Sequence, residues 1–196
     1  MISFVTKRRA VLAALCILMS PTLAAGAAAA ACPTEQTVGQ GFFLKGNTAK
    51  TEVRHLDDHF VQARTRYPDG VVQTDLYYDG LLAVSRFSQR GANMMLGADL
   101  KDWRLELKKG AKASLTYIPV ADSKPFAETT LELEVKGSET LKLGNCDFEV
   151  YVITQTSRTG KKERVYDQLF SALLKFVIAR RYPNGDLRAY LGAEAM

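Results

Sequence analysis

The chain has 196 residues with 26 basic and 21 acidic side chains, a net charge of +5. Lys7, Arg8 and Arg9 lie in the first 31 residues, which contain no acid, so the remainder has 23 basic and 21 acidic residues and a net charge of +2. A domain this close to neutrality gives no special support to nucleic-acid binding. The remaining length is sufficient for one domain with a real core.

The amino terminus predicts a cleavable signal peptide over residues 1–31. Three basic residues precede the apolar run Ala10–Met19, and an alanine-rich stretch with several Ala-x-Ala cleavage sites ends at Ala31. The apolar run is too short to span a bilayer as a stable helix. We therefore expect an exported, periplasmic protein with no transmembrane helix after cleavage. Arg8-Arg9 partly matches a twin-arginine signal, and the sequence leaves the choice between that route and Sec open.

Two cysteines remain once the signal, with Cys16, is removed. In an oxidising compartment we expect Cys32 and Cys146 to form a disulfide. A lipid anchor at Cys32 is the alternative, although Ala29 stands where lipoprotein signals normally carry leucine. A redox-active pair is not expected, because the chain has no Cys-x-x-Cys motif.

The sequence predicts a single β-rich domain over residues 32–196. Alternation of apolar and polar residues predicts strands over 103–108, 131–136, 141–143 and 148–153. Short turn signals separate such runs, at 68–70, 79–80, 109–110, 144–145, 159–160 and 183–185. Strands joined by turns this short must be mostly antiparallel. The expected fold is all-β, or mainly β with one short helix: an antiparallel meander curled into a sandwich or an open barrel.

One segment, residues 167–180, fits two structures. Leu169, Leu173 and Ile178 belong to a set with helical spacing, and Asp167 could cap a helix. However, β-branched and aromatic residues favour a strand, and the segment leads into a turn. We expect a loop followed by a strand from about Leu174 to Tyr182, and the helix remains the alternative.

Both histidines of the chain occur in one short run with two acids: His55, Asp57, Asp58 and His59. Four ligand types so close together suggest a metal site. A two-residue turn at Asp57-Asp58 would instead place the imidazoles on opposite faces of a hairpin. We therefore treat these residues as weak candidates and assign no metal and no cofactor.

No catalytic residue is assigned, because neither a Gly-x-Ser-x-Gly motif nor a Gly-rich phosphate loop occurs. Enzymatic activity stays uncertain, with a non-catalytic role favoured. Two basic-aromatic runs, each leading into a similar turn, suggest a patch for an anionic ligand or a protein partner. We favour the simpler interpretation, a solvated strand face whose charges discourage edge-to-edge aggregation, and keep the patch as the alternative. The patch would comprise Arg64, Arg66, Tyr67, Arg180, Arg181, Tyr182 and Arg188.

These observations favour a non-catalytic exported envelope protein that binds a lipid-like or other envelope ligand in or on the curled sheet. Two alternatives stay open. One is a protein-interaction module that uses exposed strand edges or the arginine-rich hairpins. The other is a hydrolase of cell-wall or lipid material. The sequence identifies neither the ligand or partner nor the oligomeric state.

Overall fold

The protein folds as one antiparallel sheet that curls on itself without closing. The structure, a computed structural model, describes residues 31–196. The described part contains one short 3-10 helix, η1 (Val38–Gln40), and fourteen strands: β1 (Phe42–Lys45), β2 (Lys50–His55), β3 (Phe60–Arg66), β4 (Val72–Tyr78), β5 (Leu82–Ser88), β6 (Gly91–Leu96), β7 (Lys112–Ala121), β8 (Lys124–Pro125), β9 (Thr129–Leu143), β10 (Cys146–Thr159), β11 (Lys162–Ser171), β12 (Phe176–Arg181), β13 (Leu187–Ala189) and β14 (Gly192–Ala195). The predicted all-β antiparallel fold is confirmed.

The signal peptide that we predict for residues 1–31 lies outside the described residues, apart from Ala31. Within residues 31–196, no helix is both long enough and apolar enough to cross a membrane.

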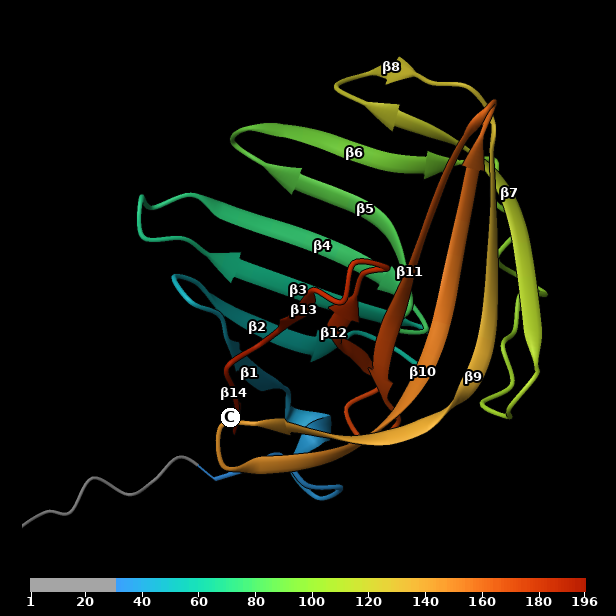
Figure 1. The fold of residues 1–196 in the computed structure, drawn as a ribbon. Helices are drawn as coiled ribbons and strands as arrows, with labels where there is room; N and C mark the ends of the chain where they lie inside the picture. Colours follow the sequence, from blue (N-terminus) through green and yellow to red (C-terminus); the bar gives the residue numbers. More distant parts are fainter. Residues whose placement is uncertain (1–30) are drawn as a thin grey trace, which may run out of the picture.

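The strand order follows the chain, as expected of a meander. From β13 at one edge, the order runs through β12, β11, β10, β9 and β7 to β6, then down to β1 and finally β14, with β8 paired to β7 alone. β7 is the corner of the sheet: its first half, Lys112–Tyr117, pairs with β9, and its second half, Ile118–Ala121, pairs with β6. Figure 1 shows the resulting curl, with β1–β6 facing the tall strands β9–β11.

The carboxy-terminal segment bridges the two edges of the sheet. β13 and β14 are consecutive in sequence, yet they lie at opposite ends of the strand order. The Tyr190 amide donates to the Ile178 carbonyl at 3.3 Å, and the Leu191 amide donates to the Lys45 carbonyl at 2.6 Å. One extended segment therefore leaves β12 and joins β1, which holds the two arms of the curl together.

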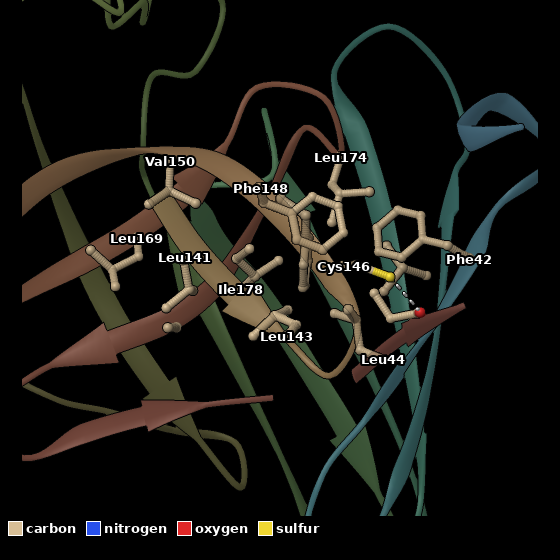
Figure 2. Close-up of a cluster of buried hydrophobic side chains, with 14 of the residues drawn as sticks. Phe42, Leu44, Leu141, Leu143, Cys146, Phe148, Val150, Leu169, Leu174 and Ile178 are labelled. Carbon is tan, nitrogen blue, oxygen red and sulfur yellow. Dashed lines mark hydrogen bonds between the residues drawn. The ribbon is translucent and has the colours of Figure 1, made fainter. Parts of the chain in front are cut away.

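Core cluster 1 packs the inner side of β1–β4 against β9–β12 (Figure 2). It contains Phe42, Leu44, Val53, Val61, Ala63, Tyr77, Leu141, Leu143, Cys146, Phe148, Val150, Leu169, Leu174, Phe176, Ile178, Ala179 and Ala193. The predicted disulfide is present: Cys32 and Cys146 are bonded, with their Cα atoms 5.7 Å apart. It ties the segment before η1 to the start of β10.

Core cluster 2 is covered by an irregular segment, residues 97–111. The cluster contains Tyr78, Leu81, Leu82, Trp103, Leu115, Leu131, Leu133, Val135, Ile153, Phe170 and Val177. The strand that we predicted over residues 103–108 is absent, which corrects that expectation. The alternation is real, because Trp103 is buried while Arg104 and Glu106 are exposed. The segment lacks ladder hydrogen bonds until Gly110, whose amide donates to the Val135 carbonyl.

The ambiguous segment 167–180 is two strands joined by a tight turn. The strand expected from about Leu174 is found as β12, but the loop expected before it is the end of β11. Asp167 caps no helix, because it lies within β11. Its carboxylate accepts a hydrogen bond from the Thr154 hydroxyl on β10 at 2.7 Å. Leu169 belongs to cluster 1 and its neighbour Phe170 to cluster 2. Burial on both faces removes the alternation that marks a half-exposed strand.

Candidate functional site

One cleft, which we call the Arg–Tyr cleft, lies between β2–β5 and β12–β13. Its volume is about 350 Å³, within the range of small-ligand sites. The side chains that give it chemical character are Thr51, Thr65, Tyr67, Gln73, Asp75, Tyr77, Arg86, Arg180, Tyr182, Arg188 and Tyr190. Most of them stand on regular strands, so ladder hydrogen bonds hold their positions.

A buried polar network forms one wall of this cleft. Asp75 is only 4% exposed, and its carboxylate accepts hydrogen bonds from Arg86 Nε at 2.6 Å and Gln73 Nε2 at 2.7 Å. The sheet register places Asp75 directly opposite Arg86. Burial alone would lower the pKa of Arg86, but the hydrogen bond and charge of Asp75 raise that pKa overall. Asp75 is thus a paired carboxylate that positions Arg86.

Tyrosine rings add neutral hydroxyls to the cleft. Burial raises the pKa of Tyr77 and of Tyr190 above the ordinary value for a phenol, so both stay protonated at neutral pH. Tyr67 and Tyr182 reach the cleft from two similar turns. In each, the tyrosine amide donates to the residue four positions on, at 3.0 Å for Tyr67 and 2.9 Å for Tyr182. The repeated Arg-Tyr-Pro run therefore produces two equivalent turns at one site.

The opposite wall carries two arginines that lie against aromatic rings. Arg180 Cζ is 5.6 Å from the ring centroid of Tyr166, and Arg188 Cζ is 4.9 Å from that of Tyr182. Within residues 31–196, neither guanidinium has a carboxylate oxygen within 4.0 Å, and Asp75 is the only acid among the lining residues. Three arginines against one carboxylate give the lining a net charge of +2, which favours anions.

The structure divides the patch that the sequence suggested. Tyr67, Arg180, Tyr182 and Arg188 all line the Arg–Tyr cleft. Arg64 and Arg66 are exposed on β3, where they alternate with the buried residues Ala63 and Thr65 and so occupy the other face of the strand.

Arg181 also points away from the Arg–Tyr cleft, because its guanidinium forms a salt bridge with the Glu139 carboxylate on β9. Sequence reasoning missed Asp75, Arg86 and Tyr190. The only available sign was the alternation of Gln73, Asp75 and Tyr77, which places these three side chains on one face of β4.

A second cleft, which we call the Trp103 cleft, has a volume of about 300 Å³. One part of its lining is apolar and comes from cluster 2 and its cover: Leu81, Trp103, Leu105, Leu107 and Phe170. The polar part comprises His55, Asp58, His59, Asp79 and Lys175. None of residues 31–196 lines both clefts.

The histidine-acid run forms a longer turn than the sequence suggested. Leu56 donates its amide to the Phe60 carbonyl at 2.8 Å, so the loop holds three residues and not two. The cause is Asp57, whose carboxylate accepts the amides of His59 and Phe60, and these hydrogen bonds lower its pKa. Asp57 is therefore committed to the turn.

His55, Asp58 and His59 all line the Trp103 cleft, although the two-residue turn would have kept the imidazoles apart. His59 Nδ1 lies 2.8 Å from the Asp79 carboxylate. Within residues 31–196, no three His, Cys, Asp or Glu side chains converge as a group that could hold a metal ion.

Together, the curled sheet and its clefts define a small β protein with ligand-sized sites. No known family model matches the chain, and no curated protein matches it in sequence. Among solved structures, it resembles the crystal structure of the hypothetical lipoprotein YmcC from Escherichia coli K12. The TM-score is 0.50 and the identity 13%, over 81% of this chain and 88% of that one. At this identity, the likeness concerns the fold alone.

Proposed function

We propose that this is an exported envelope protein that binds an anionic ligand in the Arg–Tyr cleft without transforming it. The observation that carries the proposal is the wall formed by Arg180 and Arg188, two guanidinium groups with no carboxylate partner in the described chain. They face a buried polar network that is already satisfied around Asp75. Guanidinium groups bind carboxylates and phosphates with two parallel hydrogen bonds, which gives both affinity and orientation.

Export is supported by the disulfide and by the predicted signal peptide. A bond between Cys32 and Cys146 persists in oxidising compartments and is rare in the cytosol. The solved neighbour is itself described as a hypothetical lipoprotein, which corresponds to the alternative we kept for Cys32. In this chain, a lipid thioether and the disulfide compete for the same sulfur atom. We propose the bridged form, and the mass of the mature protein without reductant distinguishes the two.

Binding without catalysis is supported by the lining residues. Among residues 31–196 they include no serine, cysteine or histidine, and the hydroxyls of Thr51 and Thr65 are hydrogen-bonded to each other at 2.9 Å. No hydroxyl in this cleft is therefore paired with a histidine base, as acyl transfer by a serine or threonine nucleophile requires. A hydrolase with paired carboxylates needs two acids, and only Asp75 is present. That carboxylate is held by Arg86 and Gln73, so it is poorly suited to accept a proton.

The ligand class follows from the same side chains. Arginines supply donors to an oxyanion, while Tyr67, Tyr182 and Tyr190 supply ring surface and hydroxyl groups for a polar body. A phosphate monoester and a sugar acid share this chemistry. An acyl chain fits the cleft poorly, because its wall buries Asp75, Thr51 and Thr65.

The test is calorimetric titration with inorganic phosphate, glucose 6-phosphate and galacturonate, at low salt. The variant Arg180→Gln/Arg188→Gln should weaken binding of the preferred anion at least tenfold. The matched control is Arg64→Gln/Arg66→Gln, which removes the same charge from the other face of β3 and should leave affinity within twofold. Equal losses in both variants would indicate a general charge effect and contradict the site, as would an absence of binding by all three anions.

A further inference from the structure

Two residues that line the Trp103 cleft each have a buried side-chain nitrogen atom without a hydrogen-bond partner. Within residues 31–196, only three buried side-chain nitrogen or oxygen atoms lack a hydrogen-bond partner: His55 Nε2, Trp103 Nε1 and Gln168 Oε1. The first two belong to residues that line this one cleft. Trp103 is only 6% exposed, so its N–H is not solvated in the ordinary way. An unpaired buried donor destabilises the folded protein, and a hydrogen bond to a bound acceptor would recover that loss.

The rest of the lining is divided by polarity. Leu105 and Leu107 continue the alternation of Trp103 along the irregular segment, and Phe170 closes the apolar part from β11. Lys175 brings an ammonium group from the β11–β12 turn. Asp79 is the partner of His59, so its carboxylate is already engaged. The cleft thus offers an apolar surface beside two hydrogen-bond donors, Trp103 Nε1 and Lys175, and the Asp58 carboxylate also lines it.

We propose that the Trp103 cleft binds a single-chain amphiphile. Its short acyl chain lies against Leu105, Leu107 and Phe170, and oxygen acceptors of its head receive hydrogen bonds from Trp103 Nε1 and Lys175. The volume of about 300 Å³ is at the lower end for ligand sites, which limits the chain length. A fatty-acid carboxylate and a monoacylglycerol ester share the required chemistry. This site is separate from the Arg–Tyr cleft and does not depend on the anion-binding proposal.

The chain itself supplies the reporter. Trp103 is the only tryptophan of the protein, so its fluorescence reports on this cleft. Titration with octanoate and with monooctanoylglycerol, both below their aggregation concentrations, should give a saturable change in emission for at least one. Butanoate, which is too short to reach the apolar surface, should give a much weaker response. No saturable change with either eight-carbon ligand would overturn the proposal.

Substitutions then test the position of the ligand. Leu107→Gln, at a half-buried site, should weaken the binding at least tenfold. The matched control Leu187→Gln changes an exposed leucine on β13 and should have no effect. If Leu107→Gln binds as tightly as the wild type, the ligand lies elsewhere and the proposal fails.

Two further variants separate the head groups and the two clefts. Lys175→Met should weaken octanoate more than the uncharged ester, and an equal effect on both ligands would contradict the placement of the head. Arg180→Gln/Arg188→Gln should leave the titration unchanged, because neither arginine lines this cleft. A loss of amphiphile binding in that variant would mean that the ligand binds in the Arg–Tyr cleft, which would overturn the proposal.

Discussion

The two clefts are built in different ways. The Arg–Tyr cleft has walls of paired strands, in which the register alone places Asp75 opposite Arg86 and Thr51 opposite Thr65. The Trp103 cleft depends on residues 97–111, which pack onto cluster 2 by apolar contact and lack ladder hydrogen bonds over most of their length. Hydrogen bonds between strands therefore fix the walls of the Arg–Tyr cleft. The shape of the Trp103 cleft depends instead on how residues 97–111, its cover, pack onto cluster 2.

This difference has consequences for local stability. Elements with few buried contacts and few backbone hydrogen bonds open at lower free energy than core strands. Leu105 and Leu107 are only half-buried, whereas Leu169 and Ile178 in cluster 1 are fully buried. We expect the cover of the Trp103 cleft to open locally more often, which would admit an apolar ligand without disturbing the other site.

The largest expected effect concerns the disulfide, which tests whether the two regions unfold together. Cys32→Ser/Cys146→Ser removes a bridge between residues 114 apart and should lower the free energy of unfolding by about 4–5 kcal/mol in the loop-entropy model. Urea unfolding measures this loss. Because β11 and β12 contribute to both clusters, far-UV circular dichroism and Trp103 emission should change at the same urea concentration. An earlier change in emission would mean that cluster 2 unfolds on its own.

Truncating one side chain in the strands of cluster 1 and one in the cover of the Trp103 cleft tests how tightly each region is packed. Ile178→Ala leaves a cavity at a site that is 0% exposed and should cost about 3 kcal/mol. Leu107→Ala removes a half-buried side chain from the cover and should cost only about 1 kcal/mol, because a segment without ladder hydrogen bonds can relax into the space. Urea midpoints give both values. Equal costs would show that the cover is packed as tightly as the strands.

The sequence predicted those features that depend on near neighbours. Alternation over residues 131–136 and 148–153 identified segments of β9 and β10, and Asp79-Gly80 identified a turn. Gly80 shows why the turn residue matters: its φ is +66°, and a Cβ built there would lie 2.0 Å from the Lys175 carbonyl oxygen. The segment at Trp103 has the same alternation as a strand but lacks a partner strand. Partner choice depends on residues far away in sequence, so the pattern alone could not show this.

The sequence predicted only part of each candidate site, because the face on which a strand residue lies also depends on pairing with distant residues. Arg180 and Arg181 are adjacent, so only one of them can face the Arg–Tyr cleft. The choice is set by a bulge, where β11 pairs Leu169 with Ala179 and then Phe170 with Val177, which skips Ile178. A bulge reverses which side chains face inward, and composition carries no sign of it. The pairing of β3 with β2 and β4 has no such bulge, and Arg64 and Arg66 lie on the exposed face of that strand.

The smallest expected effect is a pH dependence that only the Trp103 cleft should show. Burial, and secondarily the charge of Lys175, lowers the pKa of His55 below its ordinary value of 6.5. Below pH 6.5 the unfolded chain therefore binds a proton at this residue more readily than the folded protein does. The stability of the fold should fall as the pH drops from 7.5 through 6.5 towards the lower pKa of the folded state.

Urea midpoints at pH 7.5 and 5.5 measure this loss, and the same pair of measurements on His55→Gln isolates the contribution of His55 from that of other groups. The variant should lose less stability between the two pH values than the wild type. No histidine lines the Arg–Tyr cleft, so Tyr77→Phe, which alters that cleft, should retain the full wild-type dependence. An identical pH dependence in the wild type and His55→Gln would mean that the imidazole is as well solvated in the folded protein as in the unfolded chain.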